Sequence, residues 1–215
     1  MSYKNAPRYL TIFETLRDRI VYLEYPPDMQ LSEKDLCEEF NVSRTPLREA
    51  VRKLEEMKLV TVIPRFGTIV APVDIEEVRH AFEIKISLEG LAGALAAKRI
   101  ISSDLKELEA LIGQASNDGG SENRLQSLIS IDRRFHRIIH RNAQNPMLTE
   151  VLENLHSRCA RLWNSALSER IPMVDVLGQL EAIHQSLESR DSEKAEFLLR
   201  EHVRYFIEKV KVNLL

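Results

Sequence analysis

The sequence has few of the features that mark secreted and membrane proteins. Its two cysteines, Cys37 and Cys159, lie far apart and suggest no disulfide framework. No apolar run approaches the roughly 18 residues needed to cross a bilayer. The polar start, Met1–Arg8, lacks the apolar stretch of a signal peptide. We therefore expect a cytoplasmic protein with no membrane partner.

An overall excess of basic residues is also absent. The chain has 30 Lys and Arg against 33 Asp and Glu, a net charge of −3, which by itself argues weakly against nucleic-acid binding. The local balance differs, because residues 43–68 contain six basic and three acidic residues. With 44% hydrophobic residues in 215, the chain can fill the core of one large domain or two small ones.

Strand-like sequence is scarce and lies early in the chain. Residues 59–63 and 68–71 are β-branched runs separated by Pro64-Arg65-Phe66-Gly67, which predicts a hairpin. Three helical patterns precede it. They are a periodic stretch over 10–23, a short helix opened by the capping-box-like Ser32–Asp35, and a helix capped by Ser43 or Thr45 with Pro46 in its first turn.

No strand signal returns after Pro72, so the rest of the chain predicts an all-α bundle. About six helices are expected, over residues 74–100, 102–117, 122–142, 146–168, 173–189 and 192–212. The predicted fold is therefore mainly α. Residues 1–73 would form a winged helix-turn-helix domain, and residues 74–215 an all-helical domain.

The second and third helices predict a DNA-reading element. Only Asn41-Val42-Ser43 join them, which suits a helix-turn-helix. Arg44, Arg48 and Arg52 recur at i, i+4 and i+8 and form one stripe, and arginine matches guanine edges and phosphates well. The hairpin would be the wing, with Arg65 at its tip. The alternative is a solvated face whose arginines pair with nearby glutamates, but the combination of turn, stripe and hairpin favours DNA binding.

Residues 31–36, 42–54 and 64–70 resemble the GntR family of transcription regulators, most specifically in Ser43-Arg44-Thr45-Pro46 followed by Arg48-Glu49-Ala50. The resemblance implies a recognition helix opened by Thr45 and Pro46, and a glycine at the wing that enters the minor groove. Lys34 stands where an arginine is common. Its ammonium group can still neutralise a phosphate, but it lacks the two-donor geometry of a guanidinium group. The expected DNA-contacting residues are Lys34, Arg44, Thr45, Arg48, Arg52, Arg65 and Gly67.

The rest of the chain resembles the FadR-like subgroup with its FCD effector domain. The matching stretches are residues 88–97, 132–136 and 145–148 and the closing helices to His202. The resemblance implies a cytoplasmic homodimer that binds double-stranded operator DNA. It also implies that the helical domain takes a small organic acid or related metabolite, which changes operator affinity.

Many members of this subgroup hold a metal with one aspartate and three histidines. Asp132 and His136 fit the Asp-x3-His element, whose i, i+4 spacing lets both side chains reach one ion, and His202 fits the last ligand. Leu180 stands where the remaining histidine is expected, and leucine cannot ligate. His184 lies one turn beyond, and His140 is another nearby imidazole. The resemblance implies a divalent, Zn- or Ni-like metal, while the alternative is that these histidines are structural.

Effector contacts are predicted less sharply. Lys85 stands where relatives often carry an arginine facing the pocket, and it can pair with an anionic ligand or with Glu89 at i+4. Helix periodicity alone does not decide whether the other polar candidates face a pocket or the surface. They are Arg134, Arg161 and Asn164.

Two other classes of function compete with a ligand-gated regulator. A metal-dependent hydrolase could use Asp132, His136 and His202 with an open coordination position. However, the sequence shows no phosphate loop, nucleophile elbow or recognisable general-base motif. An architectural module that keeps the DNA fold but lacks a ligand is compatible with Leu180. The helix-turn-helix favours a regulator over an enzyme.

Overall fold

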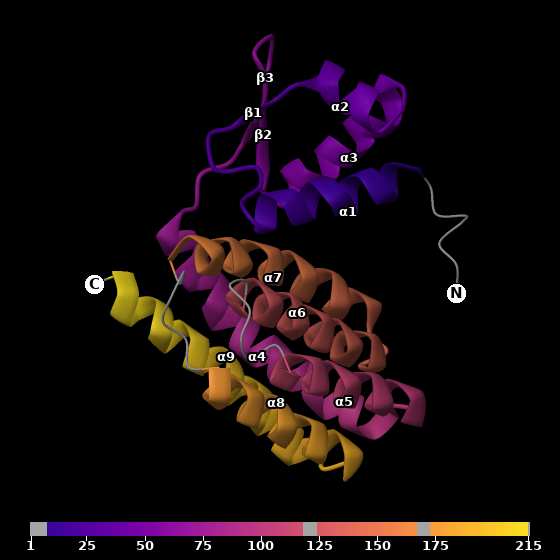
Figure 1. Cartoon of the computed structure of the whole chain (residues 1–215), viewed down its shortest axis with the longest axis vertical. Helices are drawn as coiled ribbons and strands as arrows, with labels where there is room; N and C mark the ends of the chain where they lie inside the picture. The colour runs from indigo at the N-terminus through magenta and orange to yellow at the C-terminus, as the bar shows by residue number, and fades with distance from the viewer. Residues whose placement is uncertain (1–7, 118–123, 167–172, 215) are drawn as a thin grey trace. The chain divides into compact units, whose positions relative to one another are not determined.

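The computed structural model describes residues 8–117, 124–166 and 173–214, and its cartoon is shown in Figure 1. By their internal contacts the residues divide into two compact units. The first is Met1–Val78 together with Ser157–Ser165, and the second is Arg79–His156 together with Ala166–Leu215. Among the described helices, none combines the length and the apolar character needed to span a lipid bilayer.

The first unit contains a winged helix-turn-helix. Its elements, in chain order, are α1 (Arg8–Val21), β1 (Gln30–Leu31), α2 (Glu33–Glu39), α3 (Arg44–Glu56), β2 (Val60–Ile63) and β3 (Gly67–Val70). The strands form an antiparallel sheet in the order β1-β3-β2. The Ser32 hydroxyl accepts a hydrogen bond from the Asp35 backbone N–H, so the expected cap of α2 forms. At the start of α3, Ser43 takes the cap position without a side-chain bond.

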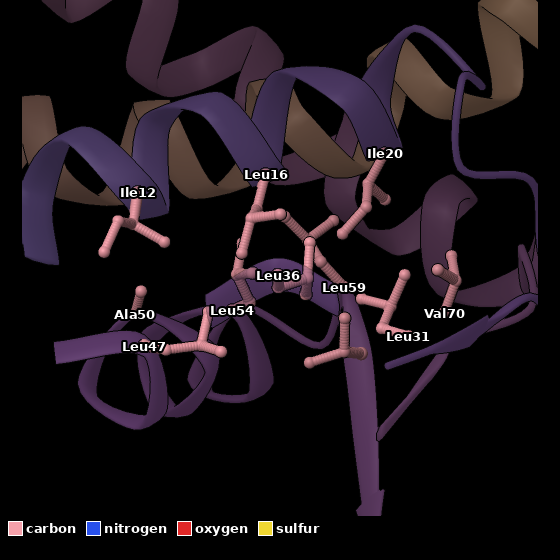
Figure 2. Packing of buried hydrophobic residues seen from close by; sticks show 11 residues of the cluster. Ile12, Leu16, Ile20, Leu31, Leu36, Leu47, Ala50, Leu54, Leu59 and Val70 are labelled. Carbon is pink, nitrogen blue, oxygen red and sulfur yellow. The ribbon is translucent and has the colours of Figure 1, made fainter. Parts of the chain in front are cut away.

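One apolar cluster holds these elements together, and Figure 2 shows how it packs. The periodic face of α1 contributes Ile12, Leu16 and Ile20, and it packs on α3. Each large aliphatic side chain that is fully buried contributes about 1.5–3 kcal/mol to the stability of the fold. The cluster also fixes the rotation of α3, because its apolar face must turn inward. The other buried members are Leu31, Leu36, Leu47, Ala50, Leu54, Leu59, Val60 and Val70.

The remaining helices form an all-α bundle, as the lack of strand signal predicted. They are α4 (Ile75–Arg99), α5 (Ser102–Asn117), α6 (Arg124–Asn142), α7 (Pro146–Ala166), α8 (Met173–Glu188) and α9 (Ser192–Leu214). In the bundle, α5 packs against α6 and α8, and α8 packs against α9. Two glycines let α4 and α9 approach closely. A Cβ on Gly93 would lie 2.9 Å from the Ala195 carbonyl oxygen, and one on Gly90 would meet the Arg200 side chain.

Candidate functional site

Helix α3 presents a basic face on the side opposite its apolar face. Leu47, Ala50 and Leu54 are buried, which turns the arginine stripe to solvent. The side chains of Arg44, Arg48 and Arg52 are 74%, 65% and 71% exposed. The i, i+4, i+8 spacing therefore does produce one accessible row of guanidinium groups.

Two of these arginines share one carboxylate on α2. Glu33 Oε1 lies 3.1 Å from Nε of Arg44, and Arg48 donates to both Glu33 oxygens from Nε at 2.9 Å and Nη2 at 3.1 Å. These hydrogen bonds raise the pKa of Arg48. Arg52 pairs instead with Glu56, at 3.8 Å. The fork of Arg48 thus holds a carboxylate in the two-pronged manner in which arginine also holds a phosphate.

The wing and α3 enclose a groove of about 850 Å³. Its lining includes Arg48 and Arg52 from α3, Arg65 from the turn between β2 and β3, and Gly67 at the start of β3. Gly67 has φ +122°, a conformation that favours glycine, and its lack of a side chain lets a ligand approach the backbone closely. The other expected DNA-contacting residues, Lys34 and Thr45, lie with Arg44 around a neighbouring shallow hollow.

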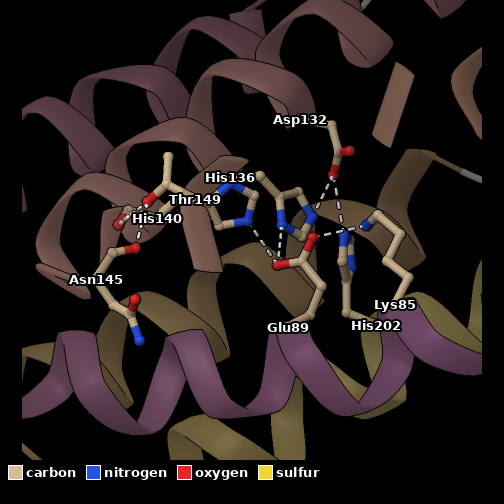
Figure 3. Close-up of polar contacts among 8 residues, drawn as sticks. All are labelled: Lys85, Glu89, Asp132, His136, His140, Asn145, Thr149 and His202. Carbon is tan, nitrogen blue, oxygen red and sulfur yellow. Dashed lines mark hydrogen bonds and ion pairs between the residues drawn. The ribbon is translucent and has the colours of Figure 1, made fainter. Parts of the chain in front are cut away.

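The second unit contains a buried group of potential metal ligands. Asp132 and His136 come from α6 and His202 from α9, and one ligand atom of each lies within 4.8 Å of the others. His202 Nε2 is 2.9 Å from Asp132 Oδ1, and His136 Nε2 is 3.8 Å from the same oxygen. Figure 3 shows the three side chains converging. The structure therefore brings together the three residues that the sequence singled out.

The hydrogen bonds of His202 fit a bound cation. Its Nδ1 lies 2.8 Å from Gln179 Oε1, while its Nε2 faces the Asp132 carboxylate. Nearby imidazoles outweigh burial and lower the pKa of Asp132, so this carboxylate is ionised. With the Gln179 amide in this orientation, both ring nitrogens of His202 face oxygen atoms that only accept hydrogen bonds. A neutral imidazole has only one N–H, so it can donate to only one of them. Burial also lowers the pKa of His202, which disfavours a second proton. A metal ion bound by both His202 Nε2 and the Asp132 carboxylate would give each of these facing groups a partner.

Glu89 on α4 holds the second imidazole in place. This carboxylate is completely buried. Its Oε2 accepts from His136 Nδ1 at 3.0 Å and from His140 Nε2 at 2.9 Å, and its Oε1 lies 2.7 Å from Lys85 Nζ. The surrounding positive groups outweigh burial and hold the pKa of Glu89 well below its usual range. Because His136 donates from Nδ1, its Nε2 is directed at the metal-ligand group, as in other carboxylate–histidine pairs behind metals.

Sequence reasoning named Glu89 only as a partner of Lys85 and His140 only as a nearby imidazole, and it did not single out Arg133. Glu89 and His140 complete the hydrogen-bond network just described, and Glu89, His136 and His140 form a second group with metal-ligand chemistry. Arg133 on α6 is buried, whereas Arg134, which the sequence singled out, is exposed and donates to Gln114. Arg133 shares a helix face with buried Ile129, His136 and His140, at i−4, i+3 and i+7, and this spacing is the signal that could have placed it inward.

His156 on α7 is the fourth imidazole of the cluster. Its ring centroid lies 6.1 Å from that of His136, and its buried Nε2 has no hydrogen-bond partner among the described residues. Burial and the charges of Lys85 and Arg133 lower its pKa well below the usual range. His156 is therefore a neutral ring within the electrostatic reach of the metal-ligand group.

Other residues singled out in the sequence lie elsewhere. Leu180 is fully buried, and His184 lies 3.2 Å, through Nε2, from the Leu105 carbonyl oxygen, so α8 supplies no imidazole to the cluster within the residues described. Arg161 belongs to the first unit, where it donates to the Ala71 carbonyl. The side chain of Asn164 lies outside the described residues.

Comparisons with known proteins match both parts of the chain. Residues 8–70 match the family model described as "Bacterial regulatory proteins, gntR family", and residues 80–205 match the model described as "FCD domain". The HTH-type transcriptional repressor RspR of Escherichia coli is 28% identical over 200 residues, covering 93% of this chain and 87% of that protein. An uncharacterized regulator of Agrobacterium vitis is 32% identical over 145 residues, covering 64% and 82% respectively.

A solved structure agrees with the fold. The structure of E. coli McbR/YncC aligns with a TM-score of 0.83 at 23% identity, over 98% of this chain and 100% of that one. At this identity the likeness supports the fold alone. The family matches and the relatives concern transcription regulators and not enzymes. The chain therefore belongs to the GntR family of bacterial regulatory proteins, with an N-terminal helix-turn-helix DNA-binding domain and an FCD effector domain.

Proposed function

We propose that this chain is a sequence-specific, homodimeric transcription regulator whose operator affinity changes when a small organic anion binds in the FCD domain beside a divalent metal. The observation that carries the proposal is the buried charged cluster around Glu89 and Asp132. Burying ionised groups is costly unless they are paired or hold a ligand. A bundle whose purpose was stability alone would fill this volume with apolar side chains.

The residues present fit a divalent metal. Asp132, His136 and His202 offer one oxygen and two nitrogens, the donor types that Zn and Ni-like ions accept in proteins. Glu89 and Gln179 orient the two imidazoles from behind. When bound, such a metal supplies a Lewis-acidic centre that favours a carboxylate oxygen. Because such an ion can expand its coordination beyond four ligands, a position remains for a small ligand.

The cations of the cluster support an anionic effector. Lys85 and Arg133 are both buried, and both act electrostatically on His156, so their charges reach the same part of the domain. Lys85 Nζ lies 2.7 Å from Glu89 Oε1, so an anionic effector would bind an ammonium group that also remains paired with Glu89. Small ligands held by a few converging charged groups in a buried setting are typical of such sites.

The α3 face supports the DNA-binding half of the proposal. In a helix-turn-helix the second helix enters the major groove, and a dimer places two such helices about 34 Å apart on a palindromic site. Arg44, Arg48 and Arg52 would contact bases and phosphates, with Lys34 and Thr45 beside them, while Arg65 and Gly67 of the wing approach the minor groove. An effector regulates this complex only if it binds one arrangement of the dimer more tightly than another.

The DNA-binding half is tested by selecting bound fragments from sheared bacterial DNA and measuring affinity by fluorescence anisotropy. Arg48→Ala should weaken binding about 5- to 150-fold at moderate salt, because a bidentate contact is worth about 1–3 kcal/mol. The matched control is Arg134→Ala, which removes an equally charged, exposed arginine from α6. Unchanged affinity of Arg48→Ala, or equal losses for both variants, would count against this interface.

The effector half is tested by the melting temperature of the metal-loaded protein with a panel of mono- and dicarboxylic acids. A ligand that binds the folded state must raise the melting temperature. An acid that does so should also change operator affinity, and Lys85→Met should weaken its effect. A protein whose melting temperature and operator affinity respond to no acid would fit an architectural module instead.

A further inference from the structure

An unpaired ring nitrogen lies next to the metal-ligand group. His156 Nε2 is buried and has no hydrogen-bond partner among the described residues. Its ring centroid lies 6.1 Å from that of His136, one of the three residues of the metal-ligand group. Buried polar atoms in folded proteins nearly always have a partner, and an exception calls for a ligand or an ion.

We propose that His156 of α7 is itself a metal ligand, which completes a set of one carboxylate and three imidazoles with Asp132, His136 and His202. This inference rests on the metal site proposed above. It assigns to α7 a donor that α8 does not supply, since Leu180 offers no donor atom and His184 lies against the Leu105 carbonyl oxygen.

The spacing of the rings is close to that of a shared ion. With metal–nitrogen distances of about 2.0–2.1 Å, two imidazoles on one tetrahedral ion have ring centroids about 5 Å apart. His136 and His202 already have this spacing, at 5.3 Å. His156 and His136 are separated by 6.1 Å, so the ring of His156 must move by about 1 Å. A small change of its side-chain torsions provides such a movement.

The other imidazole near His136 is less suited to this role. His140 Nε2 donates to Glu89 Oε2 at 2.9 Å, and His140 groups with Glu89 and His136, not with Asp132 and His202. The ring of His140 lies at a similar distance from His136, with centroids 5.9 Å apart, but its Nε2 is taken up by the bond to Glu89, whereas Nε2 of His156 is unpaired among the described residues. His140 is therefore a partner of Glu89, while His156 has a ring nitrogen free to bind an ion.

The test uses the full chain, stripped with a chelator and titrated with Zn²⁺ by calorimetry. X-ray absorption at the zinc edge then counts the imidazoles on the metal. Wild type should bind one ion per chain through three imidazoles. His156→Ala and His156→Gln should each bind through two, with affinity at least about tenfold lower, since even residues that only orient a ligand affect affinity 10- to 100-fold.

His184→Ala is the matched control, because it removes an imidazole from the bundle without touching the ligand group. It should keep wild-type affinity and three imidazoles. Melting curves of the metal-free variants check that they fold, and His156→Gln preserves polarity and approximate size at the position. If the His156 variants bind zinc as wild type does, with an equal number of imidazoles, His156 is not a ligand but the site stands. If wild type binds no zinc, the metal site itself is refuted.

Discussion

Glu89→Gln should destabilise the helical domain strongly. The carboxylate is fully buried, lies 2.7 Å from Lys85 Nζ, and accepts hydrogen bonds from two imidazoles. Glutamine keeps the shape but removes the charge, which leaves the Lys85 ammonium buried beside a neutral amide. Breaking one partner of a buried ion pair typically costs about 3–5 kcal/mol, and we expect a loss of this size in the free energy of unfolding.

The structure also predicts how this loss combines with a second substitution. Lys85→Met removes the opposite charge and replaces it with an apolar side chain of similar length. In the double variant neither charge remains unpaired, so the losses should not add. We expect the double variant to be more stable than the sum of the single effects by about 1–3 kcal/mol, as is typical of residues in direct contact.

The assay is urea unfolding followed by circular dichroism at neutral pH, with a chelator present so that metal binding does not add to stability. Wild type and all three variants are compared at matched protein concentration, and their m-values are checked for equality. A Glu89→Gln loss below about 1 kcal/mol would refute the buried ion pair. Strict additivity in the double variant would show that Lys85 and Glu89 do not interact in solution.

Three further outcomes follow from the structure. Gly93→Ala should cost about 1–3 kcal/mol of unfolding free energy, because the new methyl would meet the Ala195 carbonyl where α4 and α9 touch. Metal-free protein should lose stability as the pH falls below about 6.5. The reason is that burial lowers the pKa of His202 in the folded state, so the unfolded chain binds more protons in that range. Glu33→Gln should tighten binding to non-specific duplex DNA severalfold at low salt, since it removes a negative charge beside Arg48 on the basic face.

Each of these has a direct check. Urea midpoints test Gly93→Ala. The control is Gly113→Ala, at an open position of α5 where a Cβ meets nothing within 4 Å and alanine should stabilise the helix. An equal gain for Gly93→Ala would contradict the close approach. Unfolding curves at pH 7.5, 6.5 and 5.5 test the histidine effect, and a flat profile would contradict it. Fluorescence anisotropy at two salt concentrations tests Glu33→Gln. If the variant and wild type bind DNA with equal affinity at both concentrations, Glu33 does not weaken the attraction of the basic face for DNA.

Local sequence patterns were sufficient for much of the DNA-binding domain. The periodicity of α1, the cap at Ser32 and the β-branched runs around residues 64–67 each depend on neighbours within a few residues. Strand β1 was missed because its pairing is non-local. Gln30 and Leu31 form a strand by pairing with Ile69 and Thr68, which lie far along the chain. A two-residue strand carries no periodicity of its own.

The arrangement of the effector cluster depends on the tertiary structure. Spacing and resemblance indicated Asp132, His136 and His202, because i, i+4 positions share a helix face. The network behind them joins α4, α6, α7 and α9, and no local pattern relates residues on separate helices. Packing turned Arg133 inward and Arg134 outward, a rotation of one residue that the sequence left open.

Short-range periodicity and turn chemistry thus determined the helices and the hairpin, whereas strand β1 and the rotation of α6 were decided by contacts between distant residues. Tertiary packing decided which polar groups meet. Glu89, His140 and His156 come from three helices, and each acquires its chemistry from burial and from partners across the bundle. Burial weakens the screening of charge by water, so the electrostatic character of these groups exists only in the folded domain.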